Sequence, residues 1–415
     1  MPSIMGAEKV ALKEQSHYRE AQNASVQTQN NDVRWKAFGQ KRTLFIPVAA
    51  YATQQYALNF FLSNRWQRYA ISLANCMGVG RKVSKGFGEE WSAIKDAVAL
   101  TETIAESVVG NSEHLVFAMR QGSVGPYQKM SLIAIQENGS PAFYAKVAVG
   151  NAADAMVEAE SACLQRLSSI AALNGMVPLR LSGGVTLAGR SFFTTSVAPF
   201  LKTSASLNIQ HEQFLYDLGH ATVQWVSYAD SLELKFTKSA LERLSIVLGA
   251  AAHAELHSVS EEVISEIGEV RLPTVLAHRD FSPWNIRCSA SGIFVFDWEY
   301  AAEGANPLYD FFHFHLIQRA LSRWRTDTLT PAYALSLISP ALVYLQRTFP
   351  EVNWTSNIVR QLLLVYLVDL MLFYVDSDKL FDATHPVLSA YFNLILTRKQ
   401  WLEIEDKNLP QFKIT

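Results

Sequence analysis

The sequence predicts an α+β protein with two lobes, a small strand-rich lobe and a larger helical lobe, preceded by an N-terminal extension. Between residues 114 and 197, short β-branched and aromatic runs alternate with turn signals, and a helical repeat follows the third run. After Pro199 the apolar spacing becomes mostly helical. The 415 residues, 49% of them hydrophobic, suffice for two or three structural units with a large core.

The N-terminal part divides into two segments. Residues 1–32 are rich in Gln, Asn, Ser and Glu, a composition typical of a disordered polar tail. Residues 33–110 regain aromatic side chains, and we expect a mostly helical extension with its clearest helix over 90–109. Its glycine-containing stretches at 78–80 and 85–88 lack the spacing of a phosphate-binding loop and are predicted to be turns. The role of this extension is not indicated by any motif.

Residues 111–199 are assigned to a small antiparallel lobe of five strands and one helix. The predicted strands run over 114–119, 130–136, 142–149, 177–181 and 192–197, and the helix runs over 152–169. Asn138-Gly139 is a strong hairpin signal between the second and third strands. Gly122 and Gly125 mark the turn between the first two.

Residues 200–405 are assigned to a mainly helical lobe. Helical periodicity is clearest over 212–228, 238–257 and 357–375. A short strand-like insertion at 275–296 interrupts the helices. The most specific residues of the chain lie in and directly after this insertion.

Composition narrows the class of protein. With 36 basic and 38 acidic residues, the net charge of -2 gives no field that would attract a nucleic-acid backbone, so no such partner is expected. Three widely spaced cysteines predict neither a disulfide framework nor a zinc site and favour a reducing, cytoplasmic location. The apolar stretch 362–375 contains Asp369 and is shorter than the about 20 residues that span a bilayer, so we expect a buried helix and no membrane span.

One run carries the strongest chemical signal. His278-Arg-Asp280 is followed by Asn285 five residues after the aspartate, and the apolar strand 293–296 leads into Asp297. Phosphoryl transfer from ATP needs an oriented hydroxyl and neutralised phosphate charge. Asp280 suits the base that accepts the hydroxyl proton, and the side-chain oxygens of Asn285 and Asp297 suit Mg²⁺. Each residue alone is more typical of a turn or cap, but the H-R-D-x-x-x-x-N spacing favours catalysis.

This run resembles the H-G-D-x-x-x-x-N motif of the aminoglycoside phosphotransferase and choline kinase family. The segment Val295-Phe-Asp297-Trp-Glu299 is similar to the metal-binding segment of that family. Residues 254–257 and 304–310 add to the resemblance, which covers about 115–310. Arg279 departs from the family, which usually has glycine there. Arginine at this position is typical of protein kinases, but Trp284 and the D-W-E segment favour the small-molecule kinases.

The resemblance implies a bilobal, protein-kinase-like fold with ATP and Mg²⁺ as cofactors. It assigns the catalytic base to Asp280 and the metal ligands to Asn285 and Asp297. His278 is expected to support the catalytic loop and Asp310 to anchor it.

Two further sets of residues have open roles. Glu299 is either a support for the metal site or a surface or capping residue. His313 and His315 are expected to be core or surface histidines, with contact to the acceptor substrate as the alternative.

The nucleotide site is predicted from weaker signals in the small lobe. Lys146 lies on the third strand, where kinases have a phosphate-binding lysine, and such a lysine needs an acidic partner on the next helix. Glu160 begins an E-x-x-x-L-x-x-L run that matches the family better than the alternative, Glu158.

Two more nucleotide contacts are predicted from backbone positions. The Gly122–Gly125 turn lies where backbone amides would cover the phosphates, although a simple hairpin turn explains it equally well. The adenine is expected to contact backbone groups near Ser196 and Ala198.

We therefore predict an ATP- and Mg²⁺-dependent phosphotransferase that moves the γ-phosphate to a hydroxyl of a small molecule, such as a sugar, an amino alcohol or an aminoglycoside-like compound. The main alternative is a catalytically inactive kinase-like protein that binds a nucleotide or a partner. A protein-directed kinase is disfavoured, because no A-P-E signature and no long activation segment follow Asp297. The sequence does not indicate the acceptor, a preference between ATP and GTP, or the oligomeric state.

Overall fold

The computed structural model describes most of the chain. The described residues are 35–38, 44–47, 49, 51–62, 65–76, 81–83, 97–110, 114–150, 152–186, 189–199, 202–321, 329–382 and 384–404. The chain divides into two compact units, the first made of Met1–Ser169 and Pro178–Leu201, the second of Ile170–Val177 and Lys202–Thr415. The predicted tail at 1–32 and the predicted turns at 78–80 and 85–88 lie outside the described residues.

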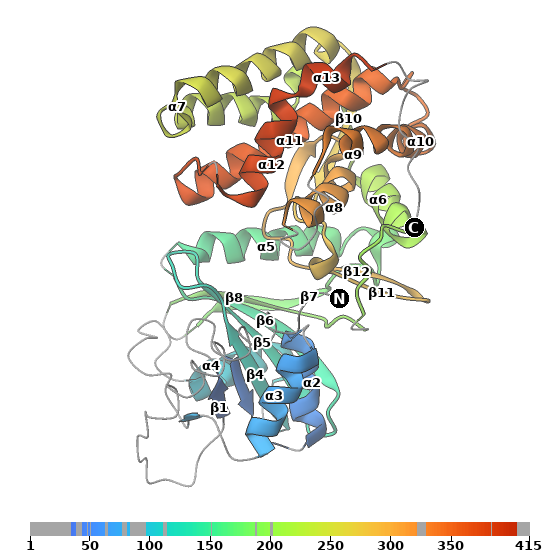
Figure 1. Cartoon of the computed structure of the whole chain (residues 1–415). Coiled ribbons are helices and arrows are strands. Elements are labelled where there is room, and N and C mark those ends of the chain that lie inside the picture. The colour runs from blue at the N-terminus through green and yellow to red at the C-terminus, as the bar shows by residue number, and fades with distance from the viewer. Residues whose placement is uncertain are drawn as a thin grey trace, which may run out of the picture. The chain divides into compact units, whose positions relative to one another are not determined.

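The first unit is built on one antiparallel sheet (Figure 1). Four of its strands correspond to those predicted: β4 (Leu115–Gln121), β5 (Lys129–Gln136), β6 (Pro141–Ala148) and β8 (Ser191–Thr195). The strand predicted over 177–181 is displaced toward the C-terminus, because β7 spans Arg180–Val185. The β5–β6 connection turns at Asn138 and Gly139, and Gly139 has φ 86°, in the left-handed region that glycine adopts without strain.

The extension adds three strands to the edge of this sheet. They are β1 (Trp35–Phe38), β2 (Leu44–Pro47) and β3 (Arg81–Val83), and the strand order is β3-β1-β2-β4-β5-β6-β8-β7. These three strands were not predicted, because runs of three or four residues are too short for a period-2 pattern to stand out. The described extension also contains three helices: α2 (Tyr51–Phe61), α3 (Arg65–Cys76) and α4 (Ala97–Val109).

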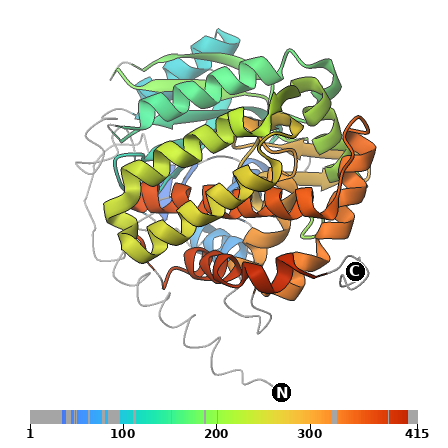
Figure 2. The same cartoon turned by 90° about the horizontal axis from the view of Figure 1, so that it is seen from above.

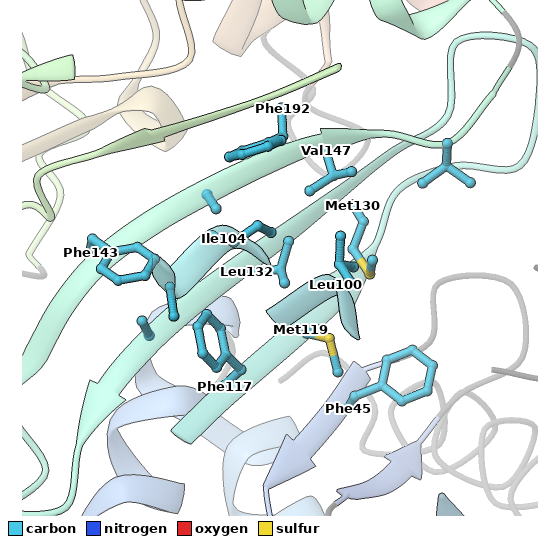
Figure 3. Packing of buried hydrophobic residues seen from close by; sticks show 14 of the residues in the cluster. Phe45, Leu100, Ile104, Phe117, Met119, Met130, Leu132, Phe143, Val147 and Phe192 are labelled. Carbon is cyan, nitrogen blue, oxygen red and sulfur yellow. The ribbon is translucent and has the colours of Figure 1, made fainter. Parts of the chain in front are cut away.

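The helices of the extension cover both faces of the sheet (Figure 1). Successive strand residues point to opposite faces, so Phe117 packs in the cluster that includes Leu100 and Ile104 of α4 (Figure 3). Ala118, the next residue, packs in the cluster that includes Leu58 of α2. A further helix of this unit, α5 (Ala153–Leu167), contacts β6 and β8.

The second unit is mainly helical. Its helices are α6 (Ile209–Thr222), α7 (Leu232–Ile267), α8 (Tyr309–Ala320), α9 (Pro331–Ser336), α10 (Ile338–Thr348), α11 (Ser356–Asp378), α12 (Pro386–Leu396) and α13 (Arg398–Leu402), with short 3₁₀ turns at Ala171–Leu173, Tyr228–Asp230 and Pro283–Asn285. Figure 2 shows α7 as two segments that meet at a sharp bend. The bend is at Gly249, whose φ of 72° and ψ of 161° are not helical.

Helix α11 forms the centre of this unit. Within the described ranges it is the one helix long and apolar enough to cross a membrane, and 83% of its most apolar window is buried inside the protein. It packs against α7, α8, α10 and α12. Such burial is typical of the core helix of a globular unit.

Short strands position the loops that carry the predicted chemistry. β10 (Arg271–Ala277) pairs with β9 (Gln224–Ser227) and β13 (Ala302–Ala305), and β11 (Ile286–Ser289) pairs with β12 (Gly292–Val295) as a hairpin. One unit thus has an antiparallel sheet and the other is mainly helical, which confirms the predicted α+β class.

Candidate active site

The loop that follows β10 is anchored by a buried carboxylate. Asp310, in the first turn of α8, accepts hydrogen bonds from the backbone N–H of His278 at 2.7 Å and of Arg279 at 2.9 Å. Burial raises the pKa of Asp310, against the opposing influence of nearby His278 and these N–H donors. Arg279 has φ 65°, a conformation that non-glycine residues rarely adopt. The anchor therefore holds the backbone in the conformation that aims the next residue, Asp280.

His278 links this loop to the end of β12. The ring is fully buried; its Nδ1 accepts from the Asp280 backbone N–H at 3.2 Å, and its Nε2 lies 3.0 Å from the Phe296 carbonyl oxygen. An N–H can only donate and a carbonyl can only accept, so this geometry requires the neutral tautomer with hydrogen on Nε2. The ring thus supports the loop, in the way expected from the sequence.

Asp280 and Asn285 are directly bonded. The Asn285 Nδ2 donates to Asp280 Oδ2 at 2.7 Å and to the Asp280 carbonyl oxygen at 3.0 Å. Because the amide nitrogen is used in this way, the amide oxygen is the atom of Asn285 that can bind a cation.

Asp297 lies close to this pair. The Phe296 N–H donates to the Asn285 carbonyl oxygen at 3.0 Å, so Asp297 directly follows a residue that is bonded to Asn285. Asp297 has φ 70°, and one of its carboxylate oxygens lies within 4.8 Å of one of Glu299. Burial raises the pKa of the Tyr300 phenol, and the negative charges of Glu299, Asp297 and Asp280 raise it further.

The structure therefore brings Asp280, Asn285 and Asp297 together in one region of the second unit. An amide oxygen with neighbouring carboxylates is a donor set that fits Mg²⁺, which prefers oxygen ligands and keeps several waters.

Asp280 has a partner that we did not predict. His313 Nε2 lies 3.2 Å from Asp280 Oδ1, and the His313 side chain is only 3% exposed. Burial alone would raise the pKa of Asp280, but the hydrogen bonds from His313 and Asn285 favour the ionised carboxylate, and the pKa lies below its usual value. A sequence signal exists: His313 lies three residues after Asp310 on α8, so both residues share a helix face.

Arg279 also has a partner that the sequence did not reveal. Its guanidinium forms an ion pair with Asp369 of α11, and the Tyr309 hydroxyl donates to the same carboxylate at 2.8 Å. The guanidinium carbon lies 5.4 Å from the ring centroid of Phe373. We had noted Asp369 only as an interruption of an apolar stretch. The positive charge of Arg279 is thus balanced by the negative charge of Asp369 inside the second unit.

In the first unit, Lys146 forms a buried ion pair. Its Nζ lies 2.6 Å from Glu160 Oε2, and the two side chains are 7% and 3% exposed. Glu158, the alternative partner, accepts instead from the Ser191 hydroxyl at 2.6 Å. The structure therefore pairs Lys146 with Glu160 on the neighbouring helix α5.

The predicted glycine turn connects β4 and β5 and has little room. A Cβ at Gly122 would lie 2.7 Å from the Lys129 carbonyl oxygen, and Gly125 has φ 152°. The turn is tied to the start of α5 by the Gly150 N–H, which donates to Gln128 O at 2.8 Å. Gly150 was not predicted, yet a Cβ there would lie only 2.1 Å from the Pro126 carbonyl oxygen.

Ser196 and Ala198 follow β8 and line a cavity of about 450 Å³ in the first unit. The other lining residues are Tyr56, Pro141, Ala142, Leu181, Val197 and Pro199. The Ser196 N–H donates to Leu179 O at 2.9 Å, so the Ser196 carbonyl is the backbone group that could contact a base. Tyr56 comes from the extension, and burial raises its pKa to about 12.

The part of the chain that contains most of these residues matches a known protein family. Residues 136–341 match the model of a family described as the phosphotransferase enzyme family. The match includes Lys146, the loop that carries Asp280, and α8, and it confirms the resemblance that the motifs predicted. A search of curated proteins finds no match.

Solved structures with some similarity were also found. Choline kinase from Cryptosporidium parvum Iowa II is 13% identical, with 73% of this chain and 96% of that chain covered and a TM-score of 0.49. Amicoumacin kinase hAmiN, in complex with AMP-PNP, Ca²⁺ and Ami, is 12% identical, with coverage of 78% and 100% and a TM-score of 0.47. A thermostable mutant of aminoglycoside phosphotransferase APH(4)-Ia, in ternary complex with AMP-PNP and hygromycin B, is 15% identical, with coverage of 72% and 98% and a TM-score of 0.46.

Proposed function

Since residues 136–341 match the model of the phosphotransferase enzyme family, we propose that this protein transfers the γ-phosphate of ATP to a hydroxyl group of a small molecule in a Mg²⁺-dependent reaction. The observation that carries the proposal is the Asp280 carboxylate, which is bonded to Asn285 at 2.7 Å and lies 3.2 Å from His313. Such a carboxylate is ionised at neutral pH and can accept a hydrogen bond from an incoming hydroxyl.

Each predicted residue has one role in this proposal. Asp280 orients the hydroxyl and takes its proton as the new O–P bond forms. Asn285 and Asp297 would hold Mg²⁺, with Glu299 beside Asp297; the bound ion would neutralise charge on the phosphates. Lys146, which Glu160 holds in place, would bind the phosphates of the nucleotide.

The remaining contacts to the nucleotide are proposed on backbone geometry. The Gly122–Gly125 turn would lie over the phosphates, and the Ser196 carbonyl and the backbone of Ala198 would contact the base. The acceptor is proposed to be a sugar, an amino alcohol or an aminoglycoside-like compound, and the location cytoplasmic, where ATP is available.

One observation favours the catalytically inactive alternative. Lys146 is paired with Phe193 of β8, and Tyr144, on the same face of β6, is paired with Thr195. The Tyr144 ring lies 6.0 Å from the Phe60 ring of α2, so the extension covers the strip between Lys146 and the chain that follows β8. A nucleotide that reached from Lys146 to residues 196–198 along this face would have to displace α2.

The test is a panel of hydroxyl metabolites with Mg²⁺ and ATP, in which formation of ADP is measured for wild type and for Asp280→Ala. Acceptor-dependent ADP from wild type alone supports the kinase. Binding of Mg-ATP, measured by calorimetry, without ADP formation from any acceptor supports the inactive alternative. Absence of nucleotide binding would contradict the kinase and would leave the inactive alternative only in its partner-binding form.

A further inference from the structure

A chain of buried polar groups leads from Asp280 into the core of the second unit. His313 Nε2 lies 3.2 Å from Asp280 Oδ1, and His313 Nδ1 lies 3.3 Å from the Tyr366 hydroxyl. The Tyr366 hydroxyl lies 2.9 Å from that of Tyr391. The three side chains come from α8, α11 and α12, and both tyrosines are completely buried.

With His313 as a neutral imidazole, the chemistry of the groups gives each hydrogen bond in this chain one direction. An ionised carboxylate only accepts, so His313 carries its hydrogen on Nε2 and donates to Asp280. The Nδ1 of a neutral imidazole accepts, so the Tyr366 hydroxyl donates to it, and Tyr391 in turn donates to Tyr366. Burial raises the pKa of both phenols, so that both keep the protons that this arrangement needs. All three donors therefore point toward Asp280.

On this basis we propose that His313, Tyr366 and Tyr391 are positioning residues, which hold the catalytic carboxylate in one orientation through a hydrogen-bonded chain. The proposal rests on the phosphotransferase function proposed above. It adds residues that the H-R-D-x-x-x-x-N motif does not contain.

The contacts of Asp280 explain why one orientation matters. Oδ2 accepts from Asn285 at 2.7 Å, and Oδ1 is bonded to His313 and lies 3.3 Å from the Ser282 hydroxyl. With donors on both oxygens, rotation of the carboxylate would break bonds on both sides, so the remaining lone pairs have fixed directions. During transfer the hydroxyl proton moves to Asp280, the new O–P bond forms and the bond to ADP breaks. The hydrogens of the chain stay on their own atoms.

His313→Leu removes the donor to Asp280 without adding volume, and we expect kcat to fall about 100-fold, the effect of a misplaced catalytic group. His313→Gln retains an amide N–H and an amide oxygen and should recover most of this loss. Tyr366→Phe should lower kcat about tenfold and Tyr391→Phe less, because each removes a hydrogen bond further from Asp280. The KM values for ATP and for the acceptor identified in the panel should change less than twofold, because no residue of the chain is proposed to touch either substrate. Loss of a direct hydrogen bond to a substrate would instead change its affinity about tenfold.

Tyr344→Phe is the matched control. It removes another buried phenol hydroxyl of the same unit, on α10, outside the chain from Asp280 to Tyr391. Equal kcat values for His313→Leu, Tyr366→Phe and this control would overturn the proposal while leaving the kinase function intact. A loss confined to KM would also overturn it.

A second readout does not depend on activity. In ¹⁵N spectra of the wild-type protein, with the His313 ring signal assigned from its loss in His313→Gln, we expect a neutral imidazole with hydrogen on Nε2. Tyr366→Phe should shift the Nδ1 resonance. A ring with hydrogen on Nδ1, or one that Tyr366→Phe leaves unchanged, would show that the chain does not exist, even if no acceptor were found.

Discussion

Lys146 and Asp280 are held in position by different means. Regular elements hold Lys146: strand β6 and helix α5 place it 2.6 Å from Glu160. Asp280 lies on an irregular loop next to Arg279, which has positive φ, and its contacts come from separate parts of the second unit. A strand or helix satisfies its own backbone, whereas a strained loop needs side chains such as Asp310 to hold it. The loop that carries Asp280 therefore depends on many buried polar partners at once.

The largest expected effect is at the base itself. Asp280→Asn keeps the shape of the side chain but removes the group that accepts the proton, and we expect kcat to fall about 1,000-fold with Mg-ATP affinity retained. The measurement is ADP formation together with calorimetric titration of Mg-ATP. Asp230→Asn, at a carboxylate that is 74% exposed, is the control and should behave as wild type. Full activity of Asp280→Asn would show that Asp280 is not the base of the reaction.

A substitution at the regular site should act mainly on stability and nucleotide binding. Lys146→Met leaves Glu160 buried without its cation, which we expect to lower the free energy of unfolding by about 3–5 kcal/mol. Adding Glu160→Gln should recover much of the stability but none of the affinity for ATP. Urea titration and calorimetry measure the two effects. Lys235→Met, at a lysine that is 58% exposed, is the matched control, and an equal loss there would contradict the comparison.

The contact between Gly150 and the segment that follows the Gly122–Gly125 turn offers a test of close packing in the first unit. Gly150→Ala would put a Cβ 2.1 Å from the Pro126 carbonyl oxygen, so the backbone must shift, and we expect a loss of about 1–3 kcal/mol in the free energy of unfolding. A Cβ at Gly292 meets nothing within 4 Å, and Gly292→Ala should be near neutral. Thermal unfolding of the two variants checks this contrast, which would disappear if the turn were loosely packed.

The last prediction concerns pH and a buried carboxylate that supports the segment before α8. Glu233 accepts from the Asn306 N–H at 2.9 Å and from the Tyr228 hydroxyl at 2.8 Å, and burial raises its pKa to about 8 from an ordinary value of 4.5. The folded protein then keeps a proton that the unfolded chain releases, so Glu233 lowers stability as pH rises from 4.5 to about 8. Denaturant titrations across this window should show the decline in wild type and a weaker one in Glu233→Gln. Identical slopes in the two proteins would refute the assignment.

Local spacing was predictable from the sequence because it depends on a few covalently linked residues. The Asn138-Gly139 hairpin, the strands β4, β5, β6 and β8 and the H-R-D-x-x-x-x-N run all depend on such short-range patterns. The contribution of the extension to the sheet was not predictable, because nothing local tells a strand of three or four residues which edge it will join.

The choice between Glu158 and Glu160 shows the same limit inside one helix. Each helical residue turns by about 100°, so two residues apart point to nearly opposite sides. Periodicity identified the helix, but packing of α5 against β6 and β8 decided that Glu160 would meet Lys146.

The sequence by itself determined the chemical groups: the proposed base, the two proposed metal ligands, a lysine and a glutamate at motif spacing. Only the tertiary structure decided their supports, which include His313 for Asp280 and Asp369 for Arg279. These supporting residues lie 33 and 90 positions from the groups that they contact. Pairs so distant in the chain are selected by the packing of whole helices, and no repeat along the sequence records that packing.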